Sequence, residues 1–258
     1  MFNRMGHLCL SLSALALAAT TGCGLDDGGA QIVVFSTHHA TPEDGIFPDK
    51  GLDDKPRIFT NDLGWEVTLL ESYITIESVT VVSCDEAEYP LDMFWGPCPE
   101  DLRAEDLNVL TVAGTKLPAG DYCELWVDYG PYVTPVVDEG TATRHETPSS
   151  PEVLGSTAFF DGGARIDVDG DALPFELRAD GQARVVLSLR SIDEGFALHV
   201  GDKENFPLEL TISKTYDRFF DGIDFANYDP EALEANLLNL VDDQTRVNLG
   251  TRVAMDEE

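Results

Sequence analysis

The sequence predicts a mainly β fold, an antiparallel sandwich or a partly open barrel with a short C-terminal helix. The longest β-branched and apolar run, residues 57–84, has the composition of strands. Gly or Pro recurs roughly every eight to twelve residues in much of the chain, which is the turn spacing of an antiparallel sheet. The apolar content of 43% is enough for a sizeable core, and no low-complexity linker divides the chain.

Residues 1–22 are expected to be an export signal, because a short segment with Arg4 and no acid precedes an apolar stretch that ends before Cys23. The apolar stretch is shorter than the roughly 20 residues that cross a bilayer as a helix. The Thr-Gly pair before Cys23 resembles a lipobox, in which this cysteine becomes the lipidated first residue of the mature chain. The alternative is ordinary cleavage that leaves Cys23 free or paired. Residues 23–30 then form a lipidated tether that holds the domain at the membrane. Gly24 after the cysteine favours, by resemblance to Gram-negative lipoproteins, the outer membrane of the cell envelope.

The chain is strongly acidic, with a formal net charge of −32, and loss of the signal removes one more cation. This charge excludes nucleic acid and anionic lipid as partners, because both would be repelled. Two interpretations of the acidity remain open. One is attraction of cations such as calcium or a transition metal, and the other is a solvated surface adapted to a salty environment.

The rest of the chain, residues 31–258, is expected to be a single β domain. Its loop excursions are placed at 37–56, 85–120 and 134–152, where Pro, Gly and acidic residues gather. Residues 101–110 could supply one or two helical turns within the second excursion.

Two adjacent histidines, His38 and His39, follow the first expected strand, residues 31–36. In an extended backbone their rings would point to opposite faces, so one metal could bind both only if the chain bends there. Imidazole is the commonest side-chain metal ligand, and three acids follow closely: Glu43, Asp44 and Asp49. His199, in a short apolar strand, is the third candidate ligand. The alternative is that the first two are exposed loop residues and the third is a strand residue satisfied by hydrogen bonds.

The run 57–84 is too long for one straight strand. Twenty extended residues would reach roughly 66 Å, more than a domain of this size. Its apolar residues change face twice, which is what one inserted residue per bulge produces. We therefore expect bulges or short turns near residues 69–72 and 77–78.

Three cysteines remain in the mature chain after Cys23, so an oxidising compartment predicts one disulfide and one odd thiol. Cys84 and Cys123 both fall on expected strands, which favours a bridge between neighbouring strands. Pairing of Cys84 with Cys98 stays open, because the chain-entropy term is about 4 kcal/mol for the longer loop and about 3 kcal/mol for the shorter one.

The second half of the chain is expected to be a meander of short strands at residues 156–160, 164–168, 173–177 and 183–189. Asp169-Gly170 is interpreted as a hairpin turn, because the calcium-loop alternative lacks the required Gly and Glu positions.

The C-terminal part predicts a strand at 208–213 and an aromatic plug at 219–225. A helix is expected to begin at Asp229, an N-cap residue followed by Pro230. Its apolar stripe consists of Leu233, Leu237, Leu238 and Val241.

Three short motifs resemble a loose group of periplasmic or surface proteins of Gram-negative bacteria: Phe-Thr-Asn-Asp-Leu-Gly-Trp-Glu-Val-Thr-Leu at 59–69, Pro-Ala-Gly-Asp-Tyr-Cys at 118–123 and Phe-Phe-Asp-Gly-Ile-Asp-Phe at 219–225. The chain is distantly similar to the methanobactin-associated copper proteins, also called metallo-mystery-pair four-Cys proteins. The resemblance implies a β domain that holds copper through histidines, beside a di-haem partner protein. No histidine matches a family ligand, so the three candidate ligands come from the residues alone.

No catalytic residue can be named. The sequence has no Gly-x-Ser-x-Gly, no His-Glu-x-x-His, no phosphate loop and no Cys/His pair at a useful spacing. The leading hypothesis is a non-enzymatic binding module of the bacterial envelope, with copper or another divalent metal as candidate cofactor and an envelope protein as candidate partner. The alternatives are a structural or adhesion lipoprotein without metal, and an enzyme of unknown class.

Overall fold

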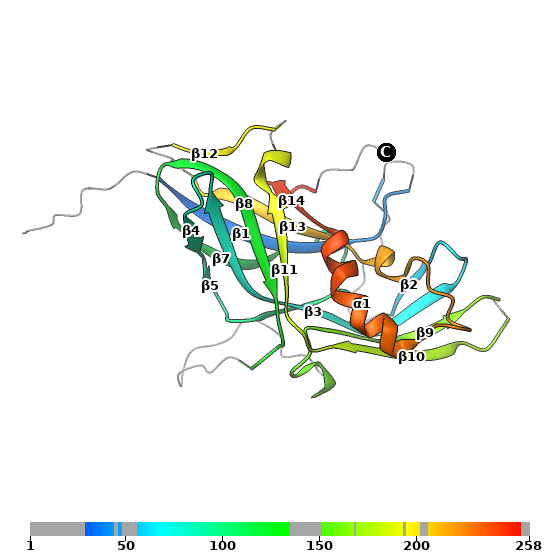
Figure 1. The fold of residues 1–258 in the computed structure, drawn as a ribbon. Coiled ribbons are helices and arrows are strands. Elements are labelled where there is room, and N and C mark those ends of the chain that lie inside the picture. The colour runs from blue at the N-terminus through cyan, green and yellow to red at the C-terminus, as the bar shows by residue number, and fades with distance from the viewer. Residues whose placement is uncertain are drawn as a thin grey trace, which may run out of the picture.

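The computed structural model describes residues 29–43, 46–47, 56–134, 151–167, 169–192, 195–201 and 206–253. The expected signal, the lipidation residue Cys23 and most of the tether lie outside these residues, as does most of the expected loop 134–152. The fold is mainly β, with two sheets that form a sandwich and not a closed barrel (Figure 1). One α-helix of the described residues lies near the C-terminus, so the predicted fold class is confirmed. No helix in this part of the chain is long and apolar enough to cross a membrane.

The small sheet has five strands in the order β14-β13-β1-β7-β5. They are β1 (Ala30–His39), β5 (Asp92–Met93), β7 (Leu110–Leu117), β13 (Leu208–Thr215) and β14 (Thr245–Leu249). β1 pairs with β13 in parallel and with β7 in antiparallel. The parallel pair differs from the expected all-antiparallel arrangement. Because β1 and β13 are far apart in sequence, no hairpin fixes their relative direction.

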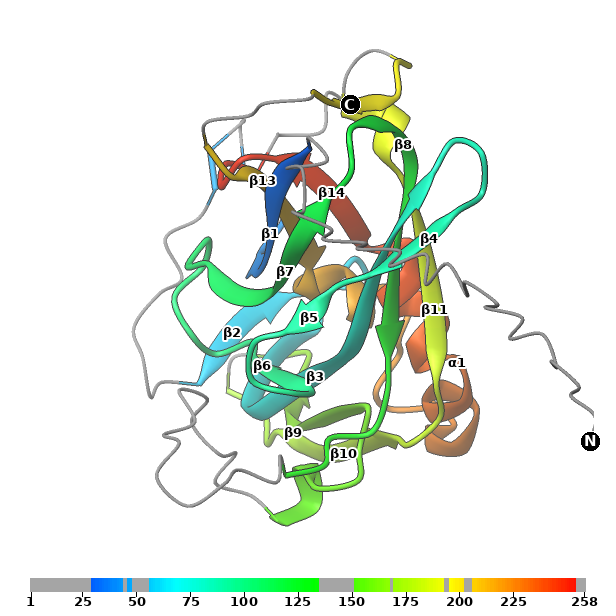
Figure 2. The ribbon, with the colours of Figure 1, turned by 90° about the vertical axis from the view of Figure 1, so that its left-hand side faces the viewer.

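The large sheet follows the path β10-β9-β3-β8-β11, with β2, β4 and β6 also paired to β3 and β12 paired to β8. Its strands are β2 (Arg57–Thr60), β3 (Glu66–Ser83), β4 (Glu88–Pro90), β6 (Cys98–Asp101), β8 (Gly120–Tyr129), β9 (Ala158–Arg165), β10 (Leu173–Ala179), β11 (Ala183–Ser188) and β12 (Leu198–Val200). The helices are η1 (Pro151–Val153), η2 (Leu189–Ser191), η3 (Tyr216–Phe220) and α1 (Pro230–Asp243). Figure 2 shows the strands of the small sheet beside β8 and β11.

β3 is a single strand of 18 residues on which the large sheet is built. Its pairing register shifts between Leu69 and Glu71 and again between Ile76 and Ser78. Both predicted bulges are therefore confirmed, and a further shift follows between Val82 and Ser83. The bulges let one strand pair with five neighbours, because each bulge bends the strand and turns a new set of side chains toward the core.

Three local expectations were wrong. β1 continues to His39, because β13 pairs with it over its full C-terminal half, so the loop begins later than residue 37. Residues 102–109 form turns and irregular backbone between β6 and β7 instead of a helix, and Leu107 has a φ of 65°. The excursion 85–120 holds four strands, β4 to β7, and β7 pairs with β1 and β5 in the small sheet.

The expected meander is also corrected. The strands placed at 156–160 and 164–168 are mostly one strand, β9, because Gly162 and Gly163 are extended and do not turn. β11 pairs with β8 and not with β10. The turn after β9 is confirmed, since the Gly170 amide donates to the Asp167 carbonyl at 2.9 Å and β9 and β10 form a hairpin.

The aromatic plug and the helix are confirmed. Phe219, Phe220 and Phe225 are buried, and Phe220 contacts Phe160 with ring centroids 5.5 Å apart. The Asp229 carboxylate accepts hydrogen bonds from the first amides of α1, and α1 lies against β10 and β11. This packing closes the end of the core formed by β2, β9 and β10.

Candidate functional site

The two adjacent histidines lie at the C-terminal end of β1 and are buried, with 2% of His38 and 6% of His39 exposed. They are therefore not exposed loop residues. Their rings meet different partners, as expected for consecutive residues of a strand: His38 contacts the Tyr216 ring, and His39 contacts the Phe47 ring.

Both ring nitrogens of His38 are engaged. Nδ1 lies 2.8 Å from Oε1 of Glu100, and Nε2 lies 3.1 Å from the carbonyl oxygen of Ala104. Because the carboxylate and the carbonyl already engage both ring nitrogens, His38 offers neither of them to a metal.

Glu100 is the centre of a buried cluster that joins the two sheets. Ser36 Oγ donates to Oε2 of Glu100 at 2.6 Å, and the Lys214 ammonium lies 2.7 Å from the same oxygen. Ser36 and His38 come from β1, Lys214 from β13, and Glu100 from β6 of the opposite sheet. Burial alone would raise the pKa of Glu100, but Lys214 and His38 outweigh it and lower the pKa to about 2. The carboxylate is therefore ionised and compensated inside the sandwich.

Ser36 and Lys214 have the composition of a Ser-Lys catalytic pair, with Nζ donating to Oγ at 2.6 Å. Burial alone would lower the pKa of Lys214, but Glu100 outweighs burial and raises it. A charged ammonium cannot serve as a general base, and the Ser36 proton already points to Glu100. Both side chains are fully buried, so the pair has the chemistry of a structural ion pair and not of a nucleophile.

Cys98 is a free, fully buried thiol on the same strand and the same face as Glu100. Burial and the nearby Glu100 carboxylate raise the pKa of Cys98 to about 12. The group is therefore protonated at neutral pH, and it is neither a nucleophile nor a thiolate ligand.

A second ion pair, Arg57 with Asp106, closes the end of this cluster. The Arg57 guanidinium donates to the carbonyls of Leu102, Arg103 and Ala104. These hydrogen bonds hold the turn after β6 in place. Its Nη1 lies 3.4 Å from Oδ1 of Asp106, without hydrogen-bond geometry for either atom. The other Asp106 oxygen accepts from the Ala40 amide at 3.1 Å. Burial raises the pKa of Asp106 more than Arg57 lowers it.

Of the two adjacent histidines, His39 is the one that keeps an available nitrogen. Its Nδ1 lies 2.8 Å from the Ala40 carbonyl oxygen, to which it can only donate. Burial lowers the pKa of His39, so the ring is neutral and Nε2 carries the lone pair. Donation from one ring nitrogen to a backbone carbonyl is the orientation that metal-binding histidines commonly have.

The three candidate ligands are not brought together. His199 lies on β12, is largely exposed, and pairs through Nδ1 with Asp121 at 2.7 Å. β12 lies at one end of the molecule and β2, which follows the histidine pair, at the other (Figure 1). Among the residues that the structure describes, no group of three or more His, Cys, Asp or Glu side chains is arranged to hold a metal. Asp44 and Asp49 lie outside the described residues, so their part in the predicted site stays a prediction.

The predicted disulfide is confirmed. Cys84 and Cys123 are bonded, with Cα atoms 4.9 Å apart, and they tie the end of β3 to β8. The alternative pairing of Cys84 with Cys98 is excluded, because Cys98 is a free thiol on β6, where it lies opposite Ile76 of β3.

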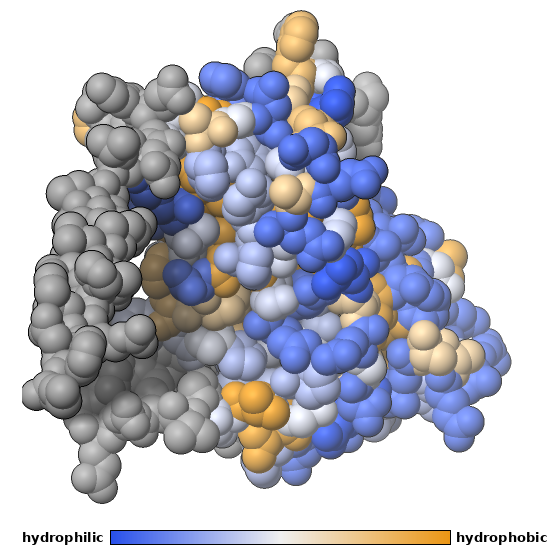
Figure 3. Space-filling view, turned by 60° about the vertical axis from the view of Figure 1, so that its left-hand side comes forward, coloured by the Kyte–Doolittle hydropathy of each residue, from blue (hydrophilic) through white to orange (hydrophobic). Residues whose placement is uncertain are grey.

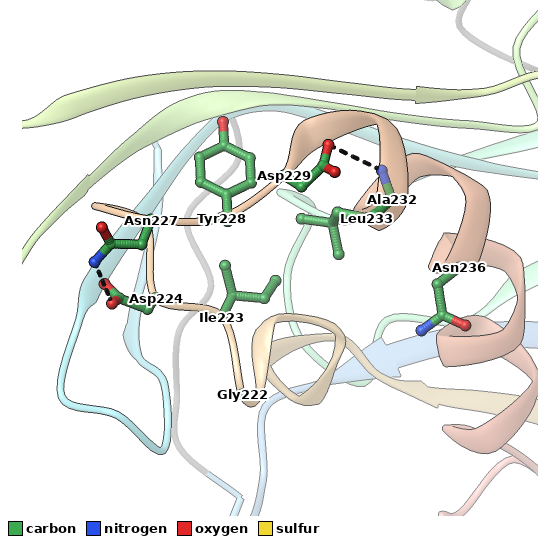
Figure 4. Close-up of a pocket in the computed structure, with 9 residues that line it drawn as sticks. All are labelled: Gly222, Ile223, Asp224, Asn227, Tyr228, Asp229, Ala232, Leu233 and Asn236. Carbon is green, nitrogen blue, oxygen red and sulfur yellow. Dashed lines mark hydrogen bonds between the residues drawn. The ribbon is translucent and has the colours of Figure 1, made fainter.

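One surface hollow of about 360 Å³ lies between α1 and the turn after η3 (Figure 4). Its acids serve the local fold: Asp229 caps α1, and Asp224 accepts from the Asn227 amide group at 2.8 Å. Figure 3 shows a face on which hydrophilic residues predominate and hydrophobic ones form small separate patches.

The buried charges were missed by sequence reasoning, although strand alternation contains a signal for them. Lys214 lies an even number of residues from the buried Leu210 and Ile212, so it faces the same side of β13. Arg57 likewise faces the same side of β2 as Phe59. A charged residue at a core-facing position of a strand requires a buried partner.

Comparisons with known proteins find one distant likeness. No protein-family model matches the chain, and no curated protein matches it. Among solved structures, MbnP from Methylosinus trichosporium is 12% identical, with a TM-score of 0.38, over 78% of this chain and 79% of that chain. This is compatible with the distant resemblance found in the sequence and supports nothing finer.

Proposed function

We propose that the chain is an exported, lipid-anchored, acidic β-sandwich of the bacterial envelope that acts as a non-enzymatic binding module. The observation that carries the export part is the Cys84–Cys123 disulfide, because such bonds persist in oxidising compartments outside the cytosol. The apolar N-terminal segment would act as the signal that directs the chain to that compartment, and Cys23 would be its lipidation site.

The buried chemistry supports binding over catalysis. Ser36, Lys214 and Cys98, which could carry nucleophilic chemistry, are enclosed and fixed in their unreactive protonation states. Glu100 and Lys214 compensate each other between the sheets. The cluster therefore serves to fix how the two sheets dock, and function is assigned to the surface.

The lipid anchor is tested by expressing the full chain in a Gram-negative host with a labelled fatty acid. We expect the wild-type chain to carry label and to sediment with the outer membrane. Cys23→Ala should carry no label, whereas Cys98→Ala, the matched control, should be labelled like the wild type. Equal fractionation of wild-type and Cys23→Ala chains into the soluble periplasm would contradict the anchor.

Metal binding, with copper or another divalent ion, is the second candidate, and the orientation of His39 favours it. One imidazole is a single ligand, so further ligands would come from the acids that follow it in sequence. A metal at a hundred times its dissociation constant should raise the free energy of unfolding by about 2.7 kcal/mol. His39→Ala should abolish that gain and His199→Ala should leave it. A chain that gains no stability from copper, zinc or calcium is the structural or adhesion lipoprotein.

A further inference from the structure

An apolar groove lies on the outer face of the large sheet, at the end formed by β2, β3, β9 and β10. It has a volume of about 380 Å³, and we call it the outer-face groove. Ile58 and Leu70, with 50% and 48% of their surface exposed, line it together with Gly163 and Pro174. The one cation among the described lining residues, Arg165, is paired with Glu66 at 2.5 Å, so it adds no free positive charge to the groove. In a chain with so many charged residues, exposed apolar side chains gathered in one hollow indicate an interaction surface.

The groove follows from the first bulge of β3. Leu69 is fully buried in the core, and the inserted residue Leu70 is turned outward. On β9, Gly163 has no side chain to fill the space, and a Cβ there would already come within 3.3 Å of Ala172. The bulge at Leu70 and the missing side chain at Gly163 therefore leave the backbone of β9 accessible next to the apolar side chain of Leu70.

A row of carboxylates borders the groove on the same face. Glu71 lies directly opposite Asp161, and Asp161 lies directly opposite Glu176, so three adjacent strands each present an acid. Burial and the Glu71 charge raise the pKa of Asp161. Like charges at opposite positions destabilise a sheet, so a cation placed between Asp161 and Glu176 relieves the repulsion between them.

The spacing of the row and the groove matches an extended peptide. Asp161 and Gly163 are two residues apart on β9, which is about 6.6 Å along a strand. Side chains on one face of an extended peptide repeat at the same distance. A peptide lying along β9 can thus place an apolar side chain in the groove and its next same-face side chain on the carboxylates.

We propose that the outer-face groove binds an extended segment of an envelope partner whose same-face side chains alternate between apolar and basic. The proposal rests on the role as a binding module and names the surface and the chemistry of the partner. Charge complementarity selects a cationic segment over a neutral or acidic one, because the carboxylate row and the net charge of −32 both attract cations. The apolar groove selects a peptide over a simple polyamine.

The test is a titration of a fluorescent peptide, Leu-Ser-Lys-Ser-Leu-Ser-Lys, with the mature chain in detergent at physiological salt. The site variant is Glu71→Gln/Asp161→Asn/Glu176→Gln. The control variant, Glu88→Gln/Asp92→Asn/Glu209→Gln, changes the net charge equally at exposed positions on β4, β5 and β13. β4 and β5 lie at the opposite end of the molecule (Figure 1).

We expect saturable binding that the site variant weakens at least about tenfold and the control variant by less than about twofold. Leu70→Ser should weaken binding without lowering the melting temperature, because the side chain is half exposed. Equal losses in the two charge variants would reduce the effect to general attraction and overturn the proposal, as would no saturable binding by the wild type. Anchoring is scored on Cys23 labelling, so its failure is distinguishable from failure of the groove.

Discussion

Replacement of Lys214 by methionine tests whether the buried cluster joins the sheets as an ion pair. Methionine has a similar length and no charge. Lys214 is fully buried and its Nζ lies 2.7 Å from Glu100 and 2.6 Å from Ser36. The substitution leaves the Glu100 carboxylate enclosed, with His38 and Ser36 as its remaining hydrogen-bond partners.

The expected loss is about 3–5 kcal/mol, the usual cost of removing one partner of a buried ion pair. Whole domains unfold with about 5–15 kcal/mol, so Lys214→Met should leave a marginally stable protein. The pKa of Glu100 should rise in this variant, because Lys214 is the largest influence that lowers it. Lys214→Met/Glu100→Gln removes both charges and should recover most of the loss.

The assay is urea unfolding followed by circular dichroism at neutral pH, with Lys116→Met as the matched control. Lys116 is exposed on β7, so its replacement should change stability by no more than about 0.5 kcal/mol. A loss below about 1 kcal/mol for Lys214→Met, or a double variant as unstable as the single one, would refute the reasoning.

Three further predictions follow from the same structure. Acid should destabilise the fold: Glu100 has a pKa of about 2 instead of 4.5, so its contribution of about 3 kcal/mol is complete above pH 4.5 and is lost as the pH falls toward 2. Urea midpoints across this range measure it, and Lys214→Met should flatten the dependence. Reduction of the disulfide, or Cys84→Ser/Cys123→Ser, should cost about 4 kcal/mol, measured by the same unfolding curves; an unchanged midpoint under reductant would contradict this. Asp161→Asn should raise stability by about 0.2–1 kcal/mol, because it removes a like charge opposite Glu71 and Glu176, and a lowered melting temperature would argue against repulsion in that row.

The strand architecture could be predicted because it depends on local patterns. The phase changes in residues 57–84 located both bulges of β3, and Asp229-Pro230 located the start of α1. The disulfide was favoured, over the open alternative of Cys84 with Cys98, because Cys84 and Cys123 both fall on expected strands. In each case the information lies within a few residues of the element concerned.

The pairing partners and the buried cluster could not be predicted in the same way. β1 joins β13 across most of the chain, and β11 joins β8 instead of its sequence neighbour β10. Neither choice leaves a local signature. Glu100 and Lys214 come from strands of opposite sheets, so their contact depends on how the two sheets dock. The alternation of apolar and polar residues along a strand shows which side chains face the core, but not which residues of the other sheet they meet. The histidines were placed in a loop because the pattern of β1 gave no sign that β13 extends it.

The parallel pairing of β1 with β13 has a consequence for the order in which the chain can fold. β1 is made early, and its partner residues from Leu208 to Thr215 are made only after most of the chain. The small sheet therefore cannot be completed, and Lys214 cannot meet Glu100, until synthesis has passed both residues. The buried ion pair can join the two sheets only at that late stage.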